Sequence, residues 1–248
     1  MKNLLTVAAL QTDLIWENSS QNLQRMDAKI NDMQSIPDFI VLPEMFNTGF
    51  TMRANSQAQT MDGNAVNWLR EKSSQTGAAI CGSVIITEDH KYYNRFLWVE
   101  AGVVKSFYDK RHLFRMAGED AHYASGKNHP IIDFKGWKIM PRICYDLRFP
   151  VWNRSSEVDL QIYVASWPAA RVSAWTTLLK ARAIENQCYT MGVNRIGKDG
   201  NGIEFNGKSL VVEPKGIEMT DVDYEDDGFI YATLDYEELI RFRQKFPV

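Results

Sequence analysis

The sequence of 248 residues predicts an α/β protein in which mixed sheets are layered with helices outside, folded as one domain over residues 1–248. Short apolar runs rich in branched residues alternate with segments whose apolar residues recur at helical spacing. After residue 189 the pattern changes to short strands separated by turns. No linker, repeat or charge block divides the chain. Because strand–helix units are followed by hairpins, we expect a layered sandwich rather than a plain parallel sheet.

The first part of the chain alternates strands with helices. Residues 4–10 and 39–42 are compact apolar runs typical of buried strands. Between them a helix begins near Asn18, where serines can cap it, and one face of this helix is apolar. That face is formed by Leu23, Met26, Ile30 and Met33. A second helix lies between Asp62 and Gly77, which can start and stop it.

Residues 78–130 contain a strand, a hairpin and a loop. The apolar run 78–87 is typical of a buried strand, and residues 92–107 predict a hairpin that turns at Ala101 and Gly102. Residues 111–130 lack periodic apolar residues and are rich in His, Gly and charge. This composition favours a surface loop that carries function.

The remaining chain begins with the segment GWKIMPRICYDLRFP, in which an apolar run leads directly to Cys144. Residues 160–165 predict another strand, followed by helical spacing that starts at Val172. Three short strands are then expected, at 189–196, 207–212 and 228–234. A helical tail starts at Asp235.

Composition and charge limit the class of protein. The chain is 45% hydrophobic and 24% charged, as in soluble globular proteins, and its apolar amino terminus is too short to span a bilayer. The net charge of -3 comes from 28 basic and 31 acidic residues that are well mixed, so a nucleic-acid partner is not expected. Three separated cysteines, Cys81, Cys144 and Cys188, favour a reducing compartment and argue against a structural metal. We therefore expect a cytoplasmic protein that binds neither membrane nor metal.

Three apolar segments end in side chains of complementary chemistry. Glu44 follows the run 39–42, Lys110 follows the hairpin, and Cys144 follows the central apolar run. If these strand ends converge, a carboxylate, an ammonium and a thiol share one pocket, which acyl transfer through a thioester requires. Glu44 can take the thiol proton, while Lys110 and the backbone amide of Tyr145 can stabilise the oxyanion.

Each of these residues also has an ordinary explanation. A free cysteine such as Cys144 usually behaves as a small buried hydrophobe, Glu44 can cap a turn, and a lysine like Lys110 is usually solvated. His112 offers an alternative base for a Cys–His pair, since most thiol hydrolases use imidazole. Glu119, in the loop, is a further candidate that spacing alone does not select.

Long motifs resemble the nitrilase superfamily of carbon–nitrogen hydrolases, whose members share a Glu, Lys, Cys triad. The motifs are LPEMFNTGF, YDKRHLF, ICYDLRFP and the segment 166–197, so the resemblance covers nearly the whole chain. The LRFPVW continuation, the Trp-Pro turn and ARAIENQ look most like the omega-amidase branch. The resemblance implies hydrolysis of the terminal amide of 2-oxo acids such as 2-oxoglutaramate and 2-oxosuccinamate to the dicarboxylate and ammonia, without metal or organic cofactor.

The resemblance also assigns roles. It implies that Cys144 is the nucleophile, Glu44 the general base and Lys110 the oxyanion-stabilising lysine, while Glu119 holds Lys110 and positions substrate. It implies an αββα four-layer sandwich and a homodimer, whose interface would include the helix after Trp167 and the tail 235–248. Another amidase, a carbamoylase or a nitrilase of the superfamily, and a noncatalytic α/β scaffold, remain alternative functions.

The substrate pocket is less defined than the reaction centre. Two positions depart from the family pattern: Arg142 stands where many relatives have a small or apolar residue, and Ser166 replaces an Asn. An arginine can pair with the distant carboxylate of the substrate, and aromatic side chains can form the walls. The candidates are Arg142, Arg148 and Arg171 for the carboxylate, and Tyr145, Phe46 and Trp167 for the walls.

Overall fold

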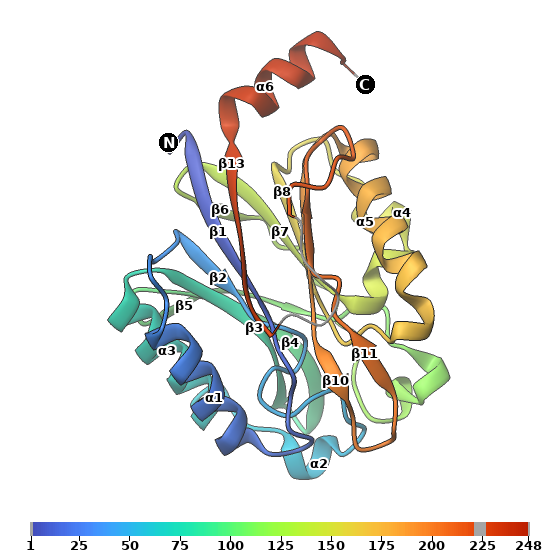
Figure 1. Cartoon of the computed structure of the whole chain (residues 1–248). Coiled ribbons are helices and arrows are strands. Elements are labelled where there is room, and N and C mark those ends of the chain that lie inside the picture. Colours follow the sequence, from blue (N-terminus) through green and yellow to red (C-terminus); the bar gives the residue numbers. More distant parts are fainter. Residues whose placement is uncertain (1, 221–226, 248) are drawn as a thin grey trace.

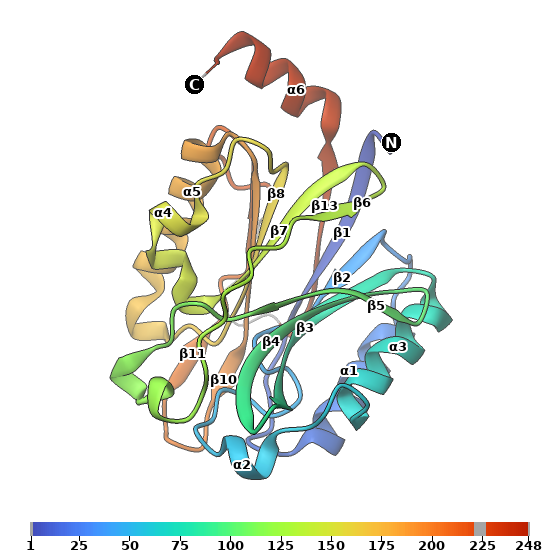
Figure 2. The same cartoon turned by 180° about the vertical axis from the view of Figure 1, so that it is seen from behind.

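The computed structural model describes residues 2–220 and 227–247. Two sheets face each other, and helices cover the outer face of each sheet (Figures 1 and 2). The expected αββα four-layer sandwich is therefore confirmed. None of the helices in the described ranges is long and apolar enough to cross a membrane.

The first sheet has six strands and is covered by α1 (Ser19–Asn31) and α3 (Asn64–Thr76). In spatial order its strands are β13 (Gly228–Asp235), β1 (Leu4–Gln11), β2 (Phe39–Val41), β3 (Ala79–Glu88), β4 (Lys91–Glu100) and β5 (Val103–Asp109). β1, β2 and β3 are parallel, so the loops after β1 and β2 leave the sheet at the same edge.

The second sheet has five strands and is covered by α5 (Val172–Asn186) and the short α4 (Pro150–Asn153). In spatial order its strands are β12 (Leu210–Val212), β9 (Tyr189–Asn194), β8 (Leu160–Ala165), β7 (Trp137–Ile143) and β6 (Ile132–Phe134). The parallel order of β7, β8 and β9 places their carboxyl ends at one edge.

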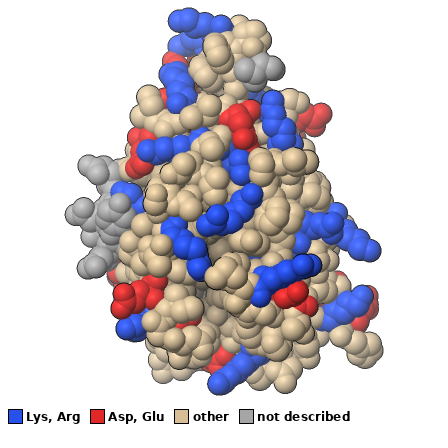
Figure 3. Space-filling view, turned by 90° about the vertical axis from the view of Figure 1, so that its right-hand side faces the viewer, with Lys and Arg blue, Asp and Glu red and all other residues tan. Residues whose placement is uncertain are grey.

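Smaller elements complete the fold. They are α2 (Ala54–Gln57), a hairpin of β10 (Ile196–Lys198) and β11 (Glu204–Asn206), and α6 (Tyr236–Lys245), which extends from one end of the sandwich (Figure 1). Figure 3 shows the side that carries α5 and this hairpin. Lys and Arg side chains are spread over this face with Asp and Glu among them, and uncharged residues fill the areas between.

Alternation along the strands builds two separate apolar layers around the first sheet. In β2, Phe39 and Val41 join the core between the sheets, whereas Ile40 joins the layer under α1 and α3. Phe39 and Trp98 have ring centroids 5.3 Å apart in the inter-sheet core. The apolar face predicted for the first helix is also found, since Met26 and Ile30 are buried in the outer layer.

The last strand has a partner that its position in the sequence does not indicate. β12 pairs with β9 in the second sheet, but β13 crosses to the first sheet and pairs antiparallel with β1 along eight residues. The succession of short strands at the end of the chain therefore serves both sheets. As a result, the first and last strands lie side by side, and the two ends of the chain are joined in one sheet.

Asp38 and Glu44 stand before and after β2, so they lie at opposite ends of this strand. Asp38 is therefore a position where stability can be tested away from Glu44. Lys2 Nζ and Lys135 Nζ contact its carboxylate at 2.7 and 2.5 Å, and the Thr6 backbone amide donates to it at 2.8 Å. Burial alone raises the pKa of Asp38, but these partners outweigh it and hold the pKa well below its usual range.

We expect Asp38→Asn to lower the free energy of unfolding by about 2 kcal/mol at pH 7, because charged hydrogen bonds are lost. A depressed carboxyl pKa stabilises the fold above the unfolded-state pKa, so the difference from wild type should shrink below about pH 4. Denaturant unfolding at several pH values measures this difference. A pH-independent difference would contradict the assigned role of the charge.

Candidate active site

The ends of β2, β5 and β7 bring three chemically reactive side chains together. Glu44 lies in the loop after β2, Lys110 directly follows β5, and Cys144 directly follows β7. Lys110 Nζ lies 2.9 Å from Glu44 Oε1, and both side chains are fully buried. Lys110 also contacts Glu119 Oε2 at 2.9 Å. The four residues proposed from the sequence therefore meet at the edge where both sheets end.

Glu44 is held in one orientation by donors from three elements. Asn94 Nδ2, from the middle of β4, donates to Oε1 at 2.7 Å, and Lys110 Nζ donates to the same oxygen. The backbone amide of Ser166, directly after β8, donates to Oε2 at 2.8 Å. Both carboxylate oxygens are thus fixed by groups from the two sheets.

Glu119 is fixed in a similar manner, although it comes from the loop 111–130. It begins a 3-10 turn, and the backbone amide of Phe114 donates to its Oε2 at 2.5 Å. Burial raises the pKa of Glu119; the charge of Lys110 opposes this shift, but the pKa stays above its usual value. The charge of Lys110 therefore favours the ionised form of Glu119 and opposes the effect of burial.

Lys110 is a cation in a dry environment. Burial by itself lowers the pKa of Lys110, but the charges of Glu119 and Glu44 outweigh burial and hold the pKa above its usual value. The ammonium consequently stays protonated, and the low local dielectric strengthens its action on any negative charge that forms nearby.

Cys144 adopts an unusual backbone conformation at the point where β7 turns into a 3-10 segment, Cys144–Arg148. Its φ of 46° lies in the left-handed region, which costs a non-glycine residue about 1 kcal/mol. Such strain persists only where surrounding contacts enforce it, and it is common at reactive positions.

The thiol is protonated at rest. Burial raises the pKa of Cys144 well above its usual value, and Glu44 raises it further through its charge and a hydrogen bond, while Lys110 lowers it. A neutral thiol beside an ionised carboxylate is an arrangement in which the proton can pass to Glu44 as sulfur attacks.

His112 is engaged elsewhere. Its Nδ1 lies 2.8 Å from Asp146 Oδ1, and its ring stacks on Phe149 with centroids 3.7 Å apart. His112 is not among the residues that line the cavity next to Cys144. This placement favours Glu44 over His112 as the base.

A cavity of about 720 Å³ opens above Cys144 and Lys110. Two of the three expected aromatic walls, Tyr145 and Trp167, line it. Phe46 does not: it is fully buried under α3, where its ring centroid lies 5.9 Å from that of Trp68. The prediction for Phe46 is corrected because its side chain belongs to the apolar layer between the first sheet and its helices.

Arg148 and Arg171 line the cavity, whereas Arg142 does not. The Arg148 guanidinium carbon lies 5.2 Å from the ring centroid of Trp167, and that of Arg171 lies 5.2 Å from Phe114. Within residues 2–220 and 227–247, neither guanidinium makes an ion pair with an acidic side chain. Two cations therefore face the cavity without a negative partner.

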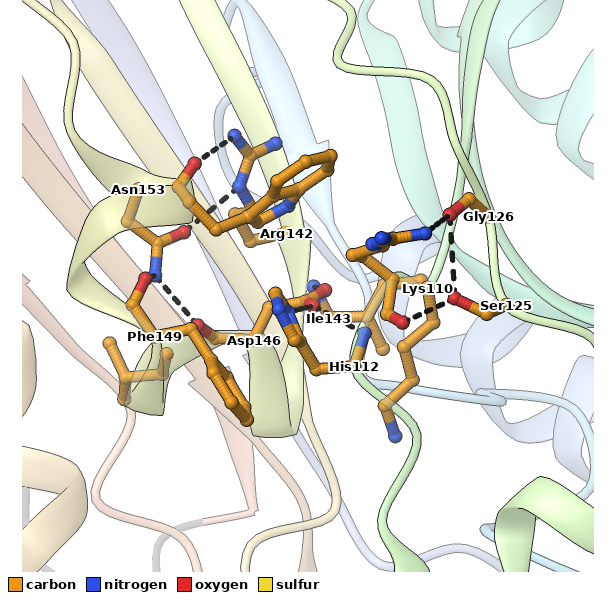
Figure 4. A network of polar contacts seen from close by, with 12 residues as sticks. Lys110, His112, Ser125, Gly126, Arg142, Ile143, Asp146, Phe149 and Asn153 are labelled. Carbon is orange, nitrogen blue, oxygen red and sulfur yellow. Dashed lines mark hydrogen bonds and ion pairs between the residues drawn. The ribbon is translucent and has the colours of Figure 1, made fainter.

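Arg142 is fully buried on the other face of β7. Because Ile139 and Ile143 point into the inter-sheet core, Arg142 points toward α4, where its Nε donates to Asn153 Oδ1 at 2.9 Å. Its Nη1 donates to the carbonyl oxygen of Pro141 at 2.7 Å. Figure 4 shows Arg142 joined to Asn153 rather than turned toward Lys110. Arg142 is therefore corrected from a substrate-binding to a supporting residue.

Several site residues were not selected from the sequence. Asn94 lies in the first half of β4, next to Arg95 and before the apolar run 96–99, so no local pattern marked it. The remaining walls come from distant segments: Trp16, Phe50, Phe114, and residues of the β10–β11 hairpin. No local pattern links these segments, because only the fold brings them together. Among the described residues, no group of three or more His, Cys, Asp or Glu side chains is placed to hold a metal ion.

Comparisons with known proteins identify the family of this chain. The family model described as carbon-nitrogen hydrolase matches residues 6–244. A protein named omega-amidase YafV from Escherichia coli (strain K12) is 45% identical over 244 residues, which cover 98% of this chain and 94% of that protein. A 2-oxoglutaramate amidase from Bacillus subtilis (strain 168) is 31% identical, with 98% of this chain and 95% of that protein covered.

Solved structures show the same similarity. XC1258 from Xanthomonas campestris, described as a CN-hydrolase superfamily protein with an arsenic adduct in the active site, superposes with a TM-score of 0.96 at 38% identity. The match covers 99% of this chain and 96% of that chain. An amidase from Nesterenkonia sp. AN1 shares the fold, with a TM-score of 0.84, 23% identity and 97% of each chain covered. On this evidence the chain belongs to the carbon-nitrogen hydrolase family.

Proposed function

We propose that this protein is an omega-amidase, which hydrolyses the terminal amide of a 2-oxo acid amide such as 2-oxoglutaramate or 2-oxosuccinamate. The buried Glu44 and Lys110 and the partly buried Cys144 supply the chemistry of amide cleavage, and the buried Glu119 holds Lys110. The observation that carries the substrate class is the pair of uncompensated guanidinium groups, Arg148 and Arg171, in the cavity that contains Cys144. The similarity to proteins named omega-amidase and 2-oxoglutaramate amidase supports the same substrate class.

In the first step Cys144 Sγ attacks the amide carbon while its proton passes to Glu44. The carbonyl oxygen gains negative charge, which Lys110 Nζ and the backbone amide of Tyr145 stabilise. Glu44 then gives its proton to the amide nitrogen, the carbon–nitrogen bond breaks, and ammonia leaves. The product of this step is a thioester on Cys144.

In the second step Glu44 takes a proton from water, and the resulting hydroxide attacks the thioester carbon. The carbon–sulfur bond breaks, the acid is released, and the proton on Glu44 returns to Cys144. Glu119 contacts no reacting atom in this scheme. It holds Lys110, so the ammonium stays directed at the site during both steps.

The two cavity arginines should determine preference for an anionic substrate. We expect Arg148→Met or Arg171→Met to raise KM for 2-oxoglutaramate about tenfold to a hundredfold, because a charge-assisted hydrogen bond is lost. Neither change should alter kcat/KM for a neutral amide such as propionamide more than about threefold, since neither arginine contacts the reacting atoms in the proposed mechanism. Parallel losses on both substrates would refute carboxylate recognition by that arginine.

Ammonia release tests the proposed function directly. The panel contains 2-oxoglutaramate, 2-oxosuccinamate, propionamide, an N-carbamoyl amino acid and a nitrile. We expect the 2-oxo acid amides to have the highest kcat/KM. Equal rates on all amides would replace the assignment by a general amidase, preference for the carbamoyl compound or nitrile would indicate those activities, and no turnover with an intact Cys144 would indicate a noncatalytic scaffold.

We also propose that the whole chain works as one domain and forms a homodimer through α5 and the C-terminal tail. Large apolar side chains are exposed on these elements: Ile184 on α5 is 54% exposed and Phe246, directly after α6, is 61% exposed. A second copy could cover them. The free thiol at the site supports the further proposal that the protein works in the cytoplasm.

Sedimentation velocity at micromolar concentration measures the assembly state. We expect a dimer for the wild type and a monomer for Ile184→Glu, because burying a carboxylate at the interface is costly. Lys91→Glu, at the exposed first residue of β4, is the matched control and should stay dimeric. A monomeric wild-type protein would contradict the proposal.

A further inference from the structure

Asp146 is a fully buried carboxylate next to the active site that the proposed mechanism does not use. It stands in the 3-10 turn that begins at Cys144, but it does not line the cavity. Its Oδ2 accepts hydrogen bonds from the Ile143 backbone amide at 3.1 Å and from Tyr108 Oη at 2.8 Å. Its Oδ1 accepts from the His112 backbone amide at 2.9 Å (Figure 4).

These partners lie on both sides of the reaction centre. Ile143 directly precedes Cys144, whereas Tyr108 and His112 stand two residues before and two residues after Lys110. β5, which carries Tyr108, belongs to the first sheet, and β7, which carries Ile143, belongs to the second. No backbone ladder joins these two strands. Asp146 therefore links the nucleophile segment to the lysine segment across the gap between the sheets.

The strained conformation of Cys144 explains why such a link matters. A left-handed φ at a cysteine is kept only where neighbouring bonds enforce it, and Asp146 holds the amide immediately before this residue. Further groups hold Asp146 in turn. Asn153 Nδ2 donates to the Asp146 carbonyl oxygen at 2.6 Å, and Arg142 donates to the side chain of Asn153. The buried Arg142 thus supports the same turn.

We propose that Asp146 is a positioning residue that sets the separation between Cys144 Sγ and Lys110 Nζ. The proposal rests on the proposed function, since it assigns Asp146 a part in the same amide hydrolysis. Asp146 acts through Ile143 on one side and through Tyr108 and His112 on the other. It touches neither the substrate nor the reacting atoms.

The test uses Asp146→Asn, which keeps the volume but replaces one acceptor oxygen by an amide donor. In either orientation of the amide, at least one of the ties to Ile143, Tyr108 or His112 is lost. We expect kcat for 2-oxoglutaramate to fall about tenfold to a hundredfold, because a small displacement of a reacting group has this effect. KM should change less than about threefold, since Asp146 does not line the cavity.

Asp159→Asn is the matched control. Asp159 is also a buried carboxylate, 3% exposed, and accepts from the Lys138 backbone amide and from Arg243, but it lies before β8, at the far end from Ser166. Its substitution should lower the midpoint of thermal unfolding while leaving kcat unchanged. Equal loss of kcat in both variants would overturn the proposal, because a general loss of stability would then explain the effect.

Thiol reactivity separates this proposal from the proposed function. The rate at which iodoacetamide modifies Cys144, followed by mass spectrometry, can be measured even if no amide is hydrolysed. If Asp146 acts by placing Cys144 beside Lys110, Asp146→Asn should slow the modification when Lys110 is present. In a protein that already carries Lys110→Ala, the same change should hardly alter the modification rate. Equal slowing in both backgrounds would overturn the proposal while leaving the amidase assignment intact.

Tyr108→Phe keeps the test decisive if Asp146→Asn fails to fold. This variant removes one hydroxyl, which donates to Asp146 and accepts from Trp152 Nε1 at 3.1 Å. The expected fall in kcat is about threefold to tenfold, with KM unchanged, and the same dependence on Lys110 should be seen in the modification rate. An unaltered kcat in a folded Tyr108→Phe protein would count against the link.

Discussion

Replacing Lys110 with alanine is expected to reduce kcat about a hundredfold to a thousandfold, which is the usual effect of removing one oxyanion donor. The ammonium is fully buried and held by Glu44 and Glu119. Alanine therefore leaves no positive charge at this position to stabilise the oxyanion. The change also leaves two carboxylates close together in a dry site. One of them should then take up a proton at neutral pH, because two unpaired like charges cannot both stay ionised there.

Steady-state kinetics on 2-oxoglutaramate measures this loss, and thermal unfolding shows whether the variant is folded. His112→Ala is the control: it removes the imidazole contact to Asp146 outside the cavity but keeps the backbone amide that donates to Asp146, so kcat should fall no more than about tenfold. The reverse outcome, with His112→Ala inactive and Lys110→Ala active, would replace the Glu-Lys-Cys mechanism by a Cys–His mechanism.

Replacing Glu44 with glutamine should separate thiol reactivity from hydrolysis. Hydrolysis should fall about a hundredfold to ten-thousandfold, because the general base of both steps is lost. Burial and then Glu44 raise the pKa of Cys144, so removing the negative charge of Glu44 lowers this pKa. The thiolate is the nucleophile in alkylation, and its population in the variant should therefore rise at a lower pH than in the wild type.

Alkylation of Cys144 as a function of pH, measured beside ammonia release, tests both parts. The expected result is a profile displaced to lower pH together with the loss of turnover. A profile displaced to higher pH would show that Glu44 does not oppose ionisation of the thiol. Turnover close to that of the wild type would exclude Glu44 as the base.

Much of the fold could be predicted because it depends on local pattern. The runs before Glu44 and Cys144 have the residue types of buried strands, and the run before Lys110 has the pattern of a hairpin strand. The helix that carries Met26 and Ile30 shows its apolar face in the sequence. The partner of β13 could not be predicted, because its residues suit an edge position in either sheet. Only the position of the free edge beside β1 selects that partner.

Some residues of the candidate site could likewise be predicted from the sequence, and others could not. The residue types at the strand ends indicated a thiol, a carboxylate and an ammonium, and the similarity of motifs added Glu119. The direction in which a side chain points could not be predicted from residue type. Phe46 and Arg142 have the residue types of a pocket wall and an anion receptor, yet both point into layers away from the cavity.

The sequence by itself thus determined the layered α/β class, the candidate reaction centre and the family resemblance, because these depend on the order and spacing of residues along the chain. The tertiary structure decided which arginines face the cavity, which donors orient Glu44, and how Asp146 connects Cys144 to the segment around Lys110. The physical reason is that these features depend on which face of a strand packs against the other sheet. That choice is made by packing between residues far apart in the chain.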